Sequence, residues 1–149
     1  MKIFCVNLDH RVDRWARMQA LAAERGLELE RVSAVNGEHD DVKARASRLP
    51  RGFSGLSIGS GALGCFESHI IIWRQLVESG APYAIAMEDD VVIAEDFDAF
   101  LETGWIPEDA DIVRLEANMR SAILSRAPAA TVSGRLVRRL WSSTLGTGC

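Results

Sequence analysis

The sequence predicts an α/β fold built on a mainly parallel sheet. Two observations support this prediction. Short apolar runs at residues 3–6 and 84–87 have the length of buried strands, and a helical periodicity follows the first of them. The order strand, helix, strand at the start of the chain is the unit from which parallel sheets are built. The length of 149 residues and the hydrophobic content of 48% fit one domain, residues 1–149.

The first predicted helix begins near Arg11, with Asp9 or His10 near its cap, and ends at Gly26, a residue type favoured just after a helix. A weaker strand candidate follows at residues 29–35. The apolar face of the helix is made of residues three or four apart: Val12, Trp15, Met18 and Ala22.

Residues 36–61 are basic and rich in glycine, and they predict a long loop that contains at most a short helix. Loops of this length are often binding loops, although a solvated basic loop fits equally well. The next predicted helix ends at Gly80 and Pro82. Its predicted inward face consists of Leu63, Phe66, Ile70, Trp73 and Val77.

After the strand at 83–91, the pattern predicts a short helix at 96–101, a strand at 111–116 and a hairpin at 132–140 around Ser133 and Gly134. Within the short helix, Phe97, Phe100 and Leu101 are expected to point inward. The sequence ends in the apolar, glycine-rich residues 145–149, so we expect the C-terminal part of the fold to be missing. An incomplete sheet leaves an open edge strand, which predicts a homodimer or a poorly soluble species.

Three consecutive carboxylates, Glu88, Asp89 and Asp90, follow the apolar run of the strand that we expect to be buried on both faces. Adjacent negative charges repel one another unless a cation lies between them. Oxygen ligands favour Mg²⁺ or Mn²⁺, and the carboxyl ends of sheet strands are where α/β proteins bind ligands. The alternative is a solvated turn or the first turn of a helix, where acids interact well with the helix dipole.

Composition excludes some classes of function. A formal net charge of −4 gives no general attraction to nucleic acid or to anionic membranes. No signal peptide and no apolar run of about 20 residues is present, which predicts a cytoplasmic protein without a transmembrane segment. The cysteines at 5, 65 and 149 show no metal-ligand spacing, and we expect reduced thiols, with Cys65 packed as a small hydrophobic side chain.

Several segments of the chain, taken in order, resemble the motifs of glycosyltransferase family 25, which includes bacterial lipooligosaccharide galactosyltransferases and collagen galactosyltransferases. The opening Val6-Asn7-Leu8-Asp9 with Arg11 and Arg14 resembles "NLD-x-R-x-x-R", and residues 61–73 resemble "G-A-x-G-C-x-x-S-H-x-x-x-W". Residues 87–91 are similar to "L-E-D-D-V", residues 111–116 to "D-I-V-x-L-E", and Gly146-Thr147-Gly148 to the start of "G-T-x-x-Y". The resemblance covers essentially the whole chain.

This resemblance implies a GT-A fold, a Rossmann-like domain that binds a UDP-sugar donor, with Mn²⁺ or Mg²⁺ as cofactor. The acid motif would play the DxD role. Asp90 would be the direct metal ligand. Glu88 would point the same way by strand alternation and serve as a second ligand or contact the sugar. Asp89 would lie near the sugar or ribose. The base and ribose would lie near Asn7, Asp9 and Arg11.

Other residues gain candidate roles from the same resemblance. Gly61 and Gly64 lie where a loop becomes a helix, and they would either present free N–H groups to an anion or serve helix packing. His69 would contact the donor sugar or a phosphate. Arg14 would reach a phosphate or pair with Asp13.

The implied reaction is the transfer of galactose, with inversion, to a lipid-linked saccharide acceptor. A lipid-linked acceptor would place the protein peripherally at the inner face of the inner membrane. Glu116 is the candidate general base, because such a transfer must deprotonate the acceptor hydroxyl. Two other classes of function stay open: a metal-dependent nucleotidyltransferase or phosphohydrolase, and a non-catalytic remnant that binds a nucleotide sugar or a partner.

Overall fold

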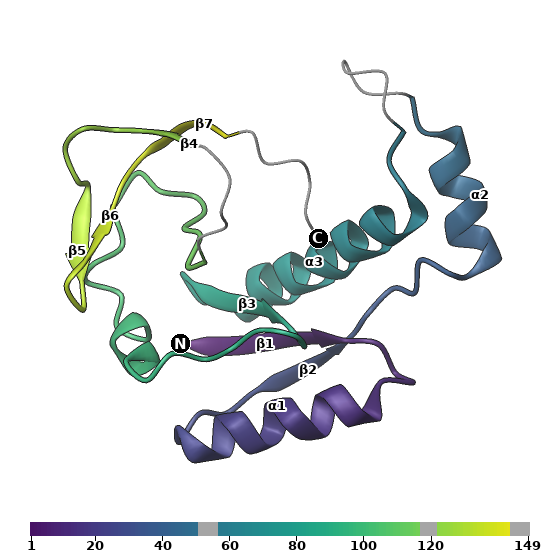
Figure 1. Cartoon of the computed structure of the whole chain (residues 1–149), viewed down its shortest axis with the longest axis horizontal. Coiled ribbons are helices and arrows are strands. Elements are labelled where there is room, and N and C mark those ends of the chain that lie inside the picture. Colours follow the sequence, from purple (N-terminus) through teal and green to yellow (C-terminus); the bar gives the residue numbers. More distant parts are fainter. Residues whose placement is uncertain (51–56, 117–121, 144–149) are drawn as a thin grey trace. The chain divides into compact units, whose positions relative to one another are not determined.

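A computed structural model of the chain describes residues 1–50, 57–116 and 122–143 (Figure 1). The contacts divide the chain into two compact units, of which the first is Met1–Ile93 and the second begins at Ala94. Each unit is described by itself. The segment Gly146-Thr147-Gly148 lies outside the described residues.

The first unit contains a three-stranded parallel sheet, as the sequence predicts. Its strands are β1 (Lys2–Asn7), β2 (Glu30–Ser33) and β3 (Ala84–Glu88), in the order β2-β1-β3. Both neighbours run parallel to β1, and Phe4 of β1 stands opposite Glu30 and Ala86. The outer edges of β2 and β3 pair with no strand in the described part of the chain, and dimerisation through such an edge remains a prediction.

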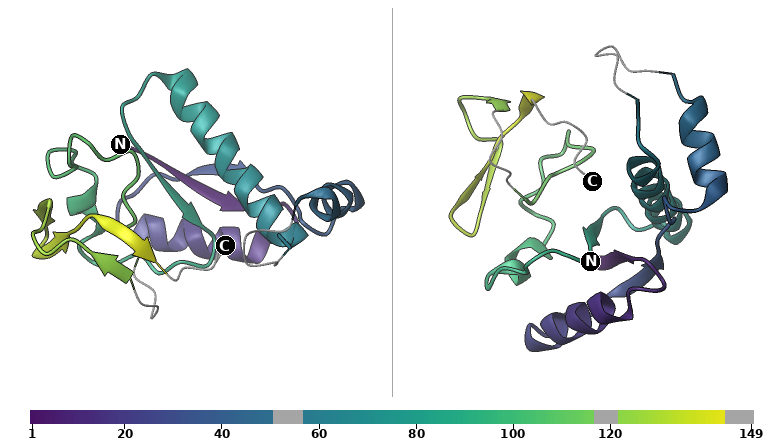
Figure 2. Two further views of the ribbon diagram at one scale, coloured as in Figure 1. Left: turned by 90° about the horizontal axis from the view of Figure 1, so that it is seen from above. Right: turned by 45° about the vertical axis from the view of Figure 1, so that its right-hand side comes forward.

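Helices α1 (Val12–Glu24) and α3 (Ser60–Ser79) cover opposite faces of this sheet (Figures 1 and 2). The central strand β1 is buried from Ile3 to Asn7 for this reason. Because side chains alternate along a strand, one set faces each helix. The α3 side has a core cluster of Phe4, Val6, Val32 and Ile72. On α1 the buried residues are Met18 and Ala22.

Strand β3 is buried on one face rather than on both. Ile85 and Met87 are buried, whereas Ala86 is exposed. The expectation of a strand buried on both faces is therefore wrong, because β3 is an edge strand of the described sheet and its α3 side is only partly covered.

Helix α3 begins at Ser60, and its buried face differs from the predicted one. Gly64, Ser68 and Ile72 are buried, whereas Phe66 and Trp73 of the predicted face are exposed. The reason is a close approach between backbones. A Cβ on Gly64 would lie 2.5 Å from the carbonyl oxygen of Val35. The Ser68 hydroxyl accepts a hydrogen bond from the backbone N–H of Val35 at 2.9 Å, so small residues, and not the large apolar ones, turn toward the loop after β2.

The ends of the helices follow the sequence in part. Gly26 and Gly80 adopt left-handed φ values of 63° and 66° after α1 and α3, as expected. The N-terminal cap of α1 is Arg11, which directly follows His10, so the expected start of the helix near Arg11, with Asp9 or His10 near the cap, is confirmed. No side chain caps the helix, and the carboxylate of Asp9 accepts a hydrogen bond from Ser33 of β2 at 2.7 Å.

Within the segment 36–61, the expected short helix is α2 (Asp40–Arg48), whose Arg45 pairs with Glu67 of α3. None of the helices in the described ranges has the length and apolar character needed to cross a bilayer.

The second unit begins with the short helix η1 (Phe97–Phe100), where it was expected. The expected hairpin consists of β5 (Ala130–Val132) and β6 (Arg135–Val137), joined by Ser133 and Gly134. Both turn residues have positive φ, as a two-residue type I′ turn requires.

A second antiparallel pair joins β4 (Ala122–Leu124) to β7 (Leu140–Ser143). The predicted strand at 111–116 is wrong: these residues form no strand, and Ile112 is 77% exposed. A strand needs a neighbour for its backbone N–H and C=O groups, and among the described residues none pairs with 111–116.

The close approach at Gly64 predicts a contrast between two glycines of one helix. Gly64→Ala should lower the free energy of unfolding by about 1–3 kcal/mol, because the added methyl group meets backbone that cannot rotate away. Gly61→Ala is the matched control. Nothing lies within 4 Å of its Cβ position, so stability should stay within about 1 kcal/mol or rise. Urea unfolding measures both, and equal effects would contradict the packing role of Gly64.

Candidate functional site

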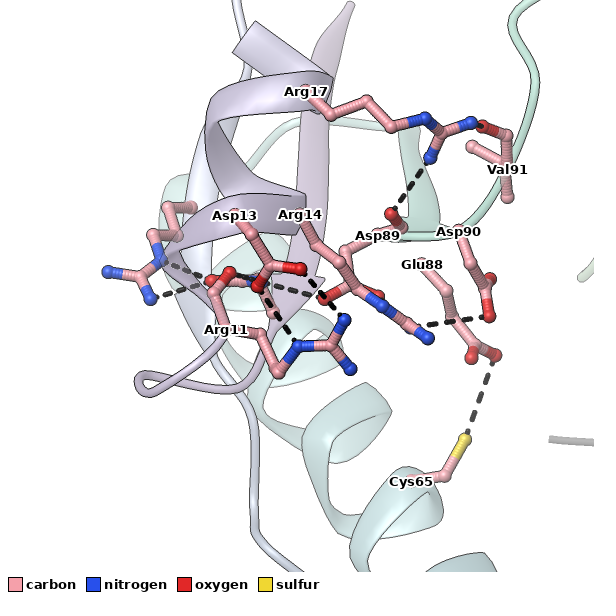
Figure 3. Close-up of polar contacts among 11 residues, drawn as sticks. Arg11, Asp13, Arg14, Arg17, Cys65, Glu88, Asp89, Asp90 and Val91 are labelled. Carbon is pink, nitrogen blue, oxygen red and sulfur yellow. Dashed lines mark hydrogen bonds and ion pairs between the residues drawn. The ribbon is translucent and has the colours of Figure 1, made fainter.

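The three parallel strands end at Asn7, Ser33 and Glu88, which places their carboxyl ends at one edge of the sheet. Ligands of open α/β sheets bind at this edge. Most of the candidate residues predicted at the ends of β1 and β3 lie together at this edge (Figure 3).

Asn7 is the centre of the polar network at this edge. Its side chain is 1% exposed and uses its full hydrogen-bonding capacity. Nδ2 donates to the backbone oxygen of Arg11 at 3.1 Å and to Oδ2 of Asp89 at 2.7 Å. Oδ1 accepts from Nε and Nη2 of Arg31 at 2.9 and 2.6 Å. One buried amide thus joins β1, the start of α1, β2 and the turn after β3.

Two arginines one turn apart on α1 hold the acid run from the same side (Figure 3). Arg14 pairs with Asp89 at 2.8 Å and reaches Asp90 at 3.5 Å. Arg17 donates to the backbone oxygens of Asp89 and Val91 at 3.3 and 3.0 Å. Asp89 is therefore neither part of a solvated turn nor the first residue of a helix, because it is buried and held by opposite charge.

The carboxylate of Asp90 differs from that of Asp89 in exposure. The Asp90 side chain is 61% exposed, against 10% for Asp89, and the contact with Arg14 is long. Strand β3 ends at Glu88, so Asp90 lies in a turn and its direction is set by that turn instead of by strand alternation. Asp90 is thus the carboxylate of the run that is most open to a ligand.

Arg31 and Asp9 extend the network along β2. Arg31 lies over the ring of Trp15, 5.6 Å from its centroid, and 3.4 Å from the carboxylate of Asp9. The stacked ring and the amide of Asn7 hold the guanidinium in place, since cations are attracted to aromatic faces. Asp9 itself is exposed.

Arg11 pairs with Asp13 at 2.9 Å. Arg14 pairs with the acid run instead. The expected alternative of an Arg14–Asp13 pair is wrong, because adjacent residues of a helix point in different directions. The hydrogen bond from Arg11 lowers the pKa of Asp13 to about 2.

Glu88 belongs to the other side of the sheet, toward α3. Its Oε1 lies 3.8 Å from Sγ of Cys65, and a ligand atom of His69 lies within 4.8 Å of both groups. Cys65 is therefore not a buried hydrophobic side chain as expected, but a half-buried group among polar atoms. On the same helix, Gly64 serves close packing, while the Cβ position of Gly61 faces open space.

Cys5 lies in β1 and is fully buried. Burial raises the pKa of its thiol to about 12, and the negative charge of Asp89 adds to the rise. The thiolate is the reactive form of cysteine, so this residue is not a nucleophile.

Glu116 lies in the second unit, where it is exposed and pairs with Arg114. Its role as a general base remains a prediction.

Three residues at this edge of the sheet were not predicted as site residues from the sequence: Arg17 and Arg31 in the network of Asn7 and Asp89, and Cys65 beside Glu88. Arg17 follows Arg14 by three residues, which places both on one face of a helix. The spacing Cys65-x-x-x-His69 likewise places both side chains on one face of α3. Arg31 gave no signal in the sequence, because its contacts cross from β2 to β1 and to α1.

Comparison with known proteins gives a consistent result. Residues 1–149 match the family described as "Glycosyltransferase family 25 (LPS biosynthesis protein)". The chain is 30% identical, over 154 aligned residues, to the lacto-N-neotetraose biosynthesis glycosyltransferase LgtB of Neisseria gonorrhoeae. This alignment covers 99% of the chain and 55% of LgtB.

Two further relatives extend the comparison. Procollagen galactosyltransferase 1 of Danio rerio is 32% identical over 97 residues, which are 60% of this chain and 16% of that protein. LgtE of Neisseria meningitidis serogroup B is 28% identical over 130 residues, 83% of this chain and 46% of LgtE. The chain thus spans about half the length of the bacterial relatives that it matches.

The full use of the Asn7 amide predicts that Asn7→Ala destabilises the protein by about 2–3 kcal/mol, because a buried carboxylate and a guanidinium each lose a partner. Ser33→Ala, which removes an exposed hydrogen bond to Asp9, should cost less than about 0.5 kcal/mol. Thermal or urea unfolding compares the two, and similar losses would show that the network contributes little.

The buried thiol predicts slow chemistry at Cys5. In a Cys149→Ala background at about pH 8, a maleimide should label Cys65 in the folded protein and Cys5 only after unfolding in urea, because the Cys5 thiol stays protonated up to a pKa of about 12. Mass spectrometry of peptides reads the result. Fast labelling of Cys5 in the folded state would contradict the burial of β1.

Proposed function

The chain belongs to glycosyltransferase family 25, and from this we propose that it acts as a glycosyltransferase on a nucleotide-sugar donor and a saccharide acceptor. The observation that carries the proposal is the acid run at the end of β3. It ends beside a network of arginines and Asn7 at the carboxyl edge of the parallel sheet, where α/β proteins bind ligands.

The finer proposal is that UDP-galactose is the donor and that galactose moves with inversion in a GT-A fold. Names of relatives support the sugar, since one is a procollagen galactosyltransferase. The description of the family as an LPS biosynthesis protein supports a lipid-linked saccharide acceptor and, with it, a cytoplasmic place at the inner face of the inner membrane.

The residues present fit a divalent cation of the Mg²⁺ or Mn²⁺ class. Asp90 offers an exposed carboxylate, and Glu88 offers a second one two residues earlier. Both supply oxygen, the ligand atom that these ions prefer. A cation held there would neutralise the negative charge that develops on the diphosphate as its bond to the sugar breaks.

The remaining residues would shape this site. Asp89 is fully engaged by Asn7 and Arg14, and we assign it the role of fixing the turn that presents Asp90. Asn7 is buried, so it would position Arg11 and Arg31 near the nucleotide without touching it. Asp9 and Arg11 lie toward solvent and would contact the base and ribose. His69 and the first turn of α3 at Gly61 would lie toward the sugar and phosphates, and Glu116 would act as the general base.

A second function is supported by the coverage of the relatives. Because the chain spans 55% of LgtB, donor binding without transfer is the alternative. The two functions share the donor site and differ in turnover.

Binding of UDP-galactose should depend on Mn²⁺ and on Asp90. In isothermal titration calorimetry, Asp90→Asn should weaken Mn²⁺-dependent binding on the order of tenfold or more, because a direct ligand is lost. Glu24→Gln is the matched control, since Glu24 is an exposed carboxylate at the far end of α1, and it should bind as the natural chain does.

Binding that is independent of the metal, or no binding of any nucleotide sugar, would overturn the donor-site proposal. Release of UDP in the presence of a lactose-type acceptor then separates transfer from binding alone.

A further inference from the structure

Three side chains of different chemistry converge on the α3 side of β3. Cys65 and His69 are four residues apart on α3, which places them on one face of the helix. Glu88 is the last residue of β3 and faces the same helix. Sγ of Cys65, an imidazole nitrogen of His69 and a carboxylate oxygen of Glu88 all lie within 4.8 Å of one another. Figure 3 shows the contact between Cys65 and Glu88.

The spacing of these atoms fits a tetrahedral ion. Bonds of about 2.0–2.3 Å to sulfur, nitrogen and oxygen place the ligand atoms of tetrahedral zinc about 3.3–3.8 Å apart. The distance from Sγ of Cys65 to Oε1 of Glu88 is 3.8 Å. The other pairs of ligand atoms lie within 4.8 Å, so shifts of at most about 1–1.5 Å, which side-chain rotations can supply, would complete the set.

The elements that carry the ligands are held firmly. The backbone at Gly64 lies against the loop after β2, and the hydroxyl of Ser68 donates to the carbonyl oxygen of Gly64 at 2.7 Å and accepts from Val35. Cys65 follows Gly64 in the chain and His69 follows Ser68, so each ligand is next to an anchored residue. Glu88 is fixed by pairing of β3 with β1. Ligands on such rigid elements lose little freedom when an ion binds.

We propose that Cys65, His69 and Glu88 form a binding site for a thiophilic divalent cation of the Zn²⁺ class. Sulfur and imidazole select Zn²⁺ or Co²⁺ over Mg²⁺ and Mn²⁺, which prefer oxygen. The cysteine binds as thiolate, so its proton passes to solvent when the ion enters. Three protein ligands leave one tetrahedral position for water or another ligand.

This site is distinct from the proposed donor cation at Asp90, although both would use Glu88. It requires neither a nucleotide sugar nor transfer of a sugar. Cys65 is specific to the thiophilic site, whereas His69 also belongs to the proposed donor contacts, and Asp90, which contacts Arg14, belongs to the donor site. Variants of Cys65 and of Asp90 therefore separate the two sites.

The test is a titration of the 149-residue chain, carrying Cys149→Ala, with Co²⁺. The expected result is a thiolate-to-cobalt charge-transfer band in the near ultraviolet, together with the intense visible bands of tetrahedral cobalt, and loss of both on addition of Zn²⁺. Cys65→Ser should remove the charge-transfer band, and His69→Ala should weaken cobalt binding and the visible bands. His39→Ala, which changes an exposed histidine at the start of α2, is the control and should leave the spectrum unchanged.

Absence of the charge-transfer band would overturn the proposal, as would a band that persists in Cys65→Ser. Circular dichroism shows that each variant is folded, and Cys65→Ser keeps the size of the side chain. Mn²⁺-dependent binding of UDP-galactose, measured on the same Cys65→Ser protein, should be retained. If Cys65→Ser loses the cobalt charge-transfer band but still binds UDP-galactose, the thiol belongs to the thiophilic site. If the natural chain does not bind UDP-galactose, only the proposed function is contradicted.

Discussion

The carboxyl edge of the sheet depends on one buried amide. Asn7 ends the central strand, and three groups from different elements converge on its buried side chain. Its two N–H groups and its oxygen meet the backbone of Arg11, the carboxylate of Asp89 and the guanidinium of Arg31. An aspartate in this place would repel Asp89, and an apolar side chain would leave a buried carboxylate and a cation without a neutral bridge. The start of α1 and the turn after β3 both take their positions from this contact.

Strand alternation then divides three consecutive acids into different environments. Asp89 faces α1 and is neutralised by Arg14, while Glu88 faces α3 and lies beside Cys65. Asp90 follows the end of the strand and stays open to solvent. A cluster of like charges is tolerated because each charge has its own surroundings, and Asp89 is the carboxylate that the fold buries.

Much of the first unit could be predicted from the sequence. The strand at 3–6, the helix after it and the strand that ends in the acids follow from short apolar runs, helical periodicity and glycine stops, which are local signals. The buried face of α3 could not be predicted, because it depends on the contact of Gly64 with Val35, two residues far apart in the chain. The prediction of a strand at 111–116 was wrong for a related reason. Its apolar alternation is a local pattern, but a strand forms only beside another strand with which it can pair. In the site, motif resemblance found Asn7, Asp89 and Asp90, whereas Arg31 depends on contacts between elements.

The separation of Glu88 from Asp89 makes the two faces of the strand end independent of each other. Side chains on α3 can change while the arginine network on α1 remains intact, because the two groups share only the backbone of β3. A substitution of Cys65 or His69 therefore alters the α3 side of this strand end and leaves the contacts of the turn that carries Asp90 in place. One strand end thus combines a fixed polar frame on one face with an independent set of side chains on the other.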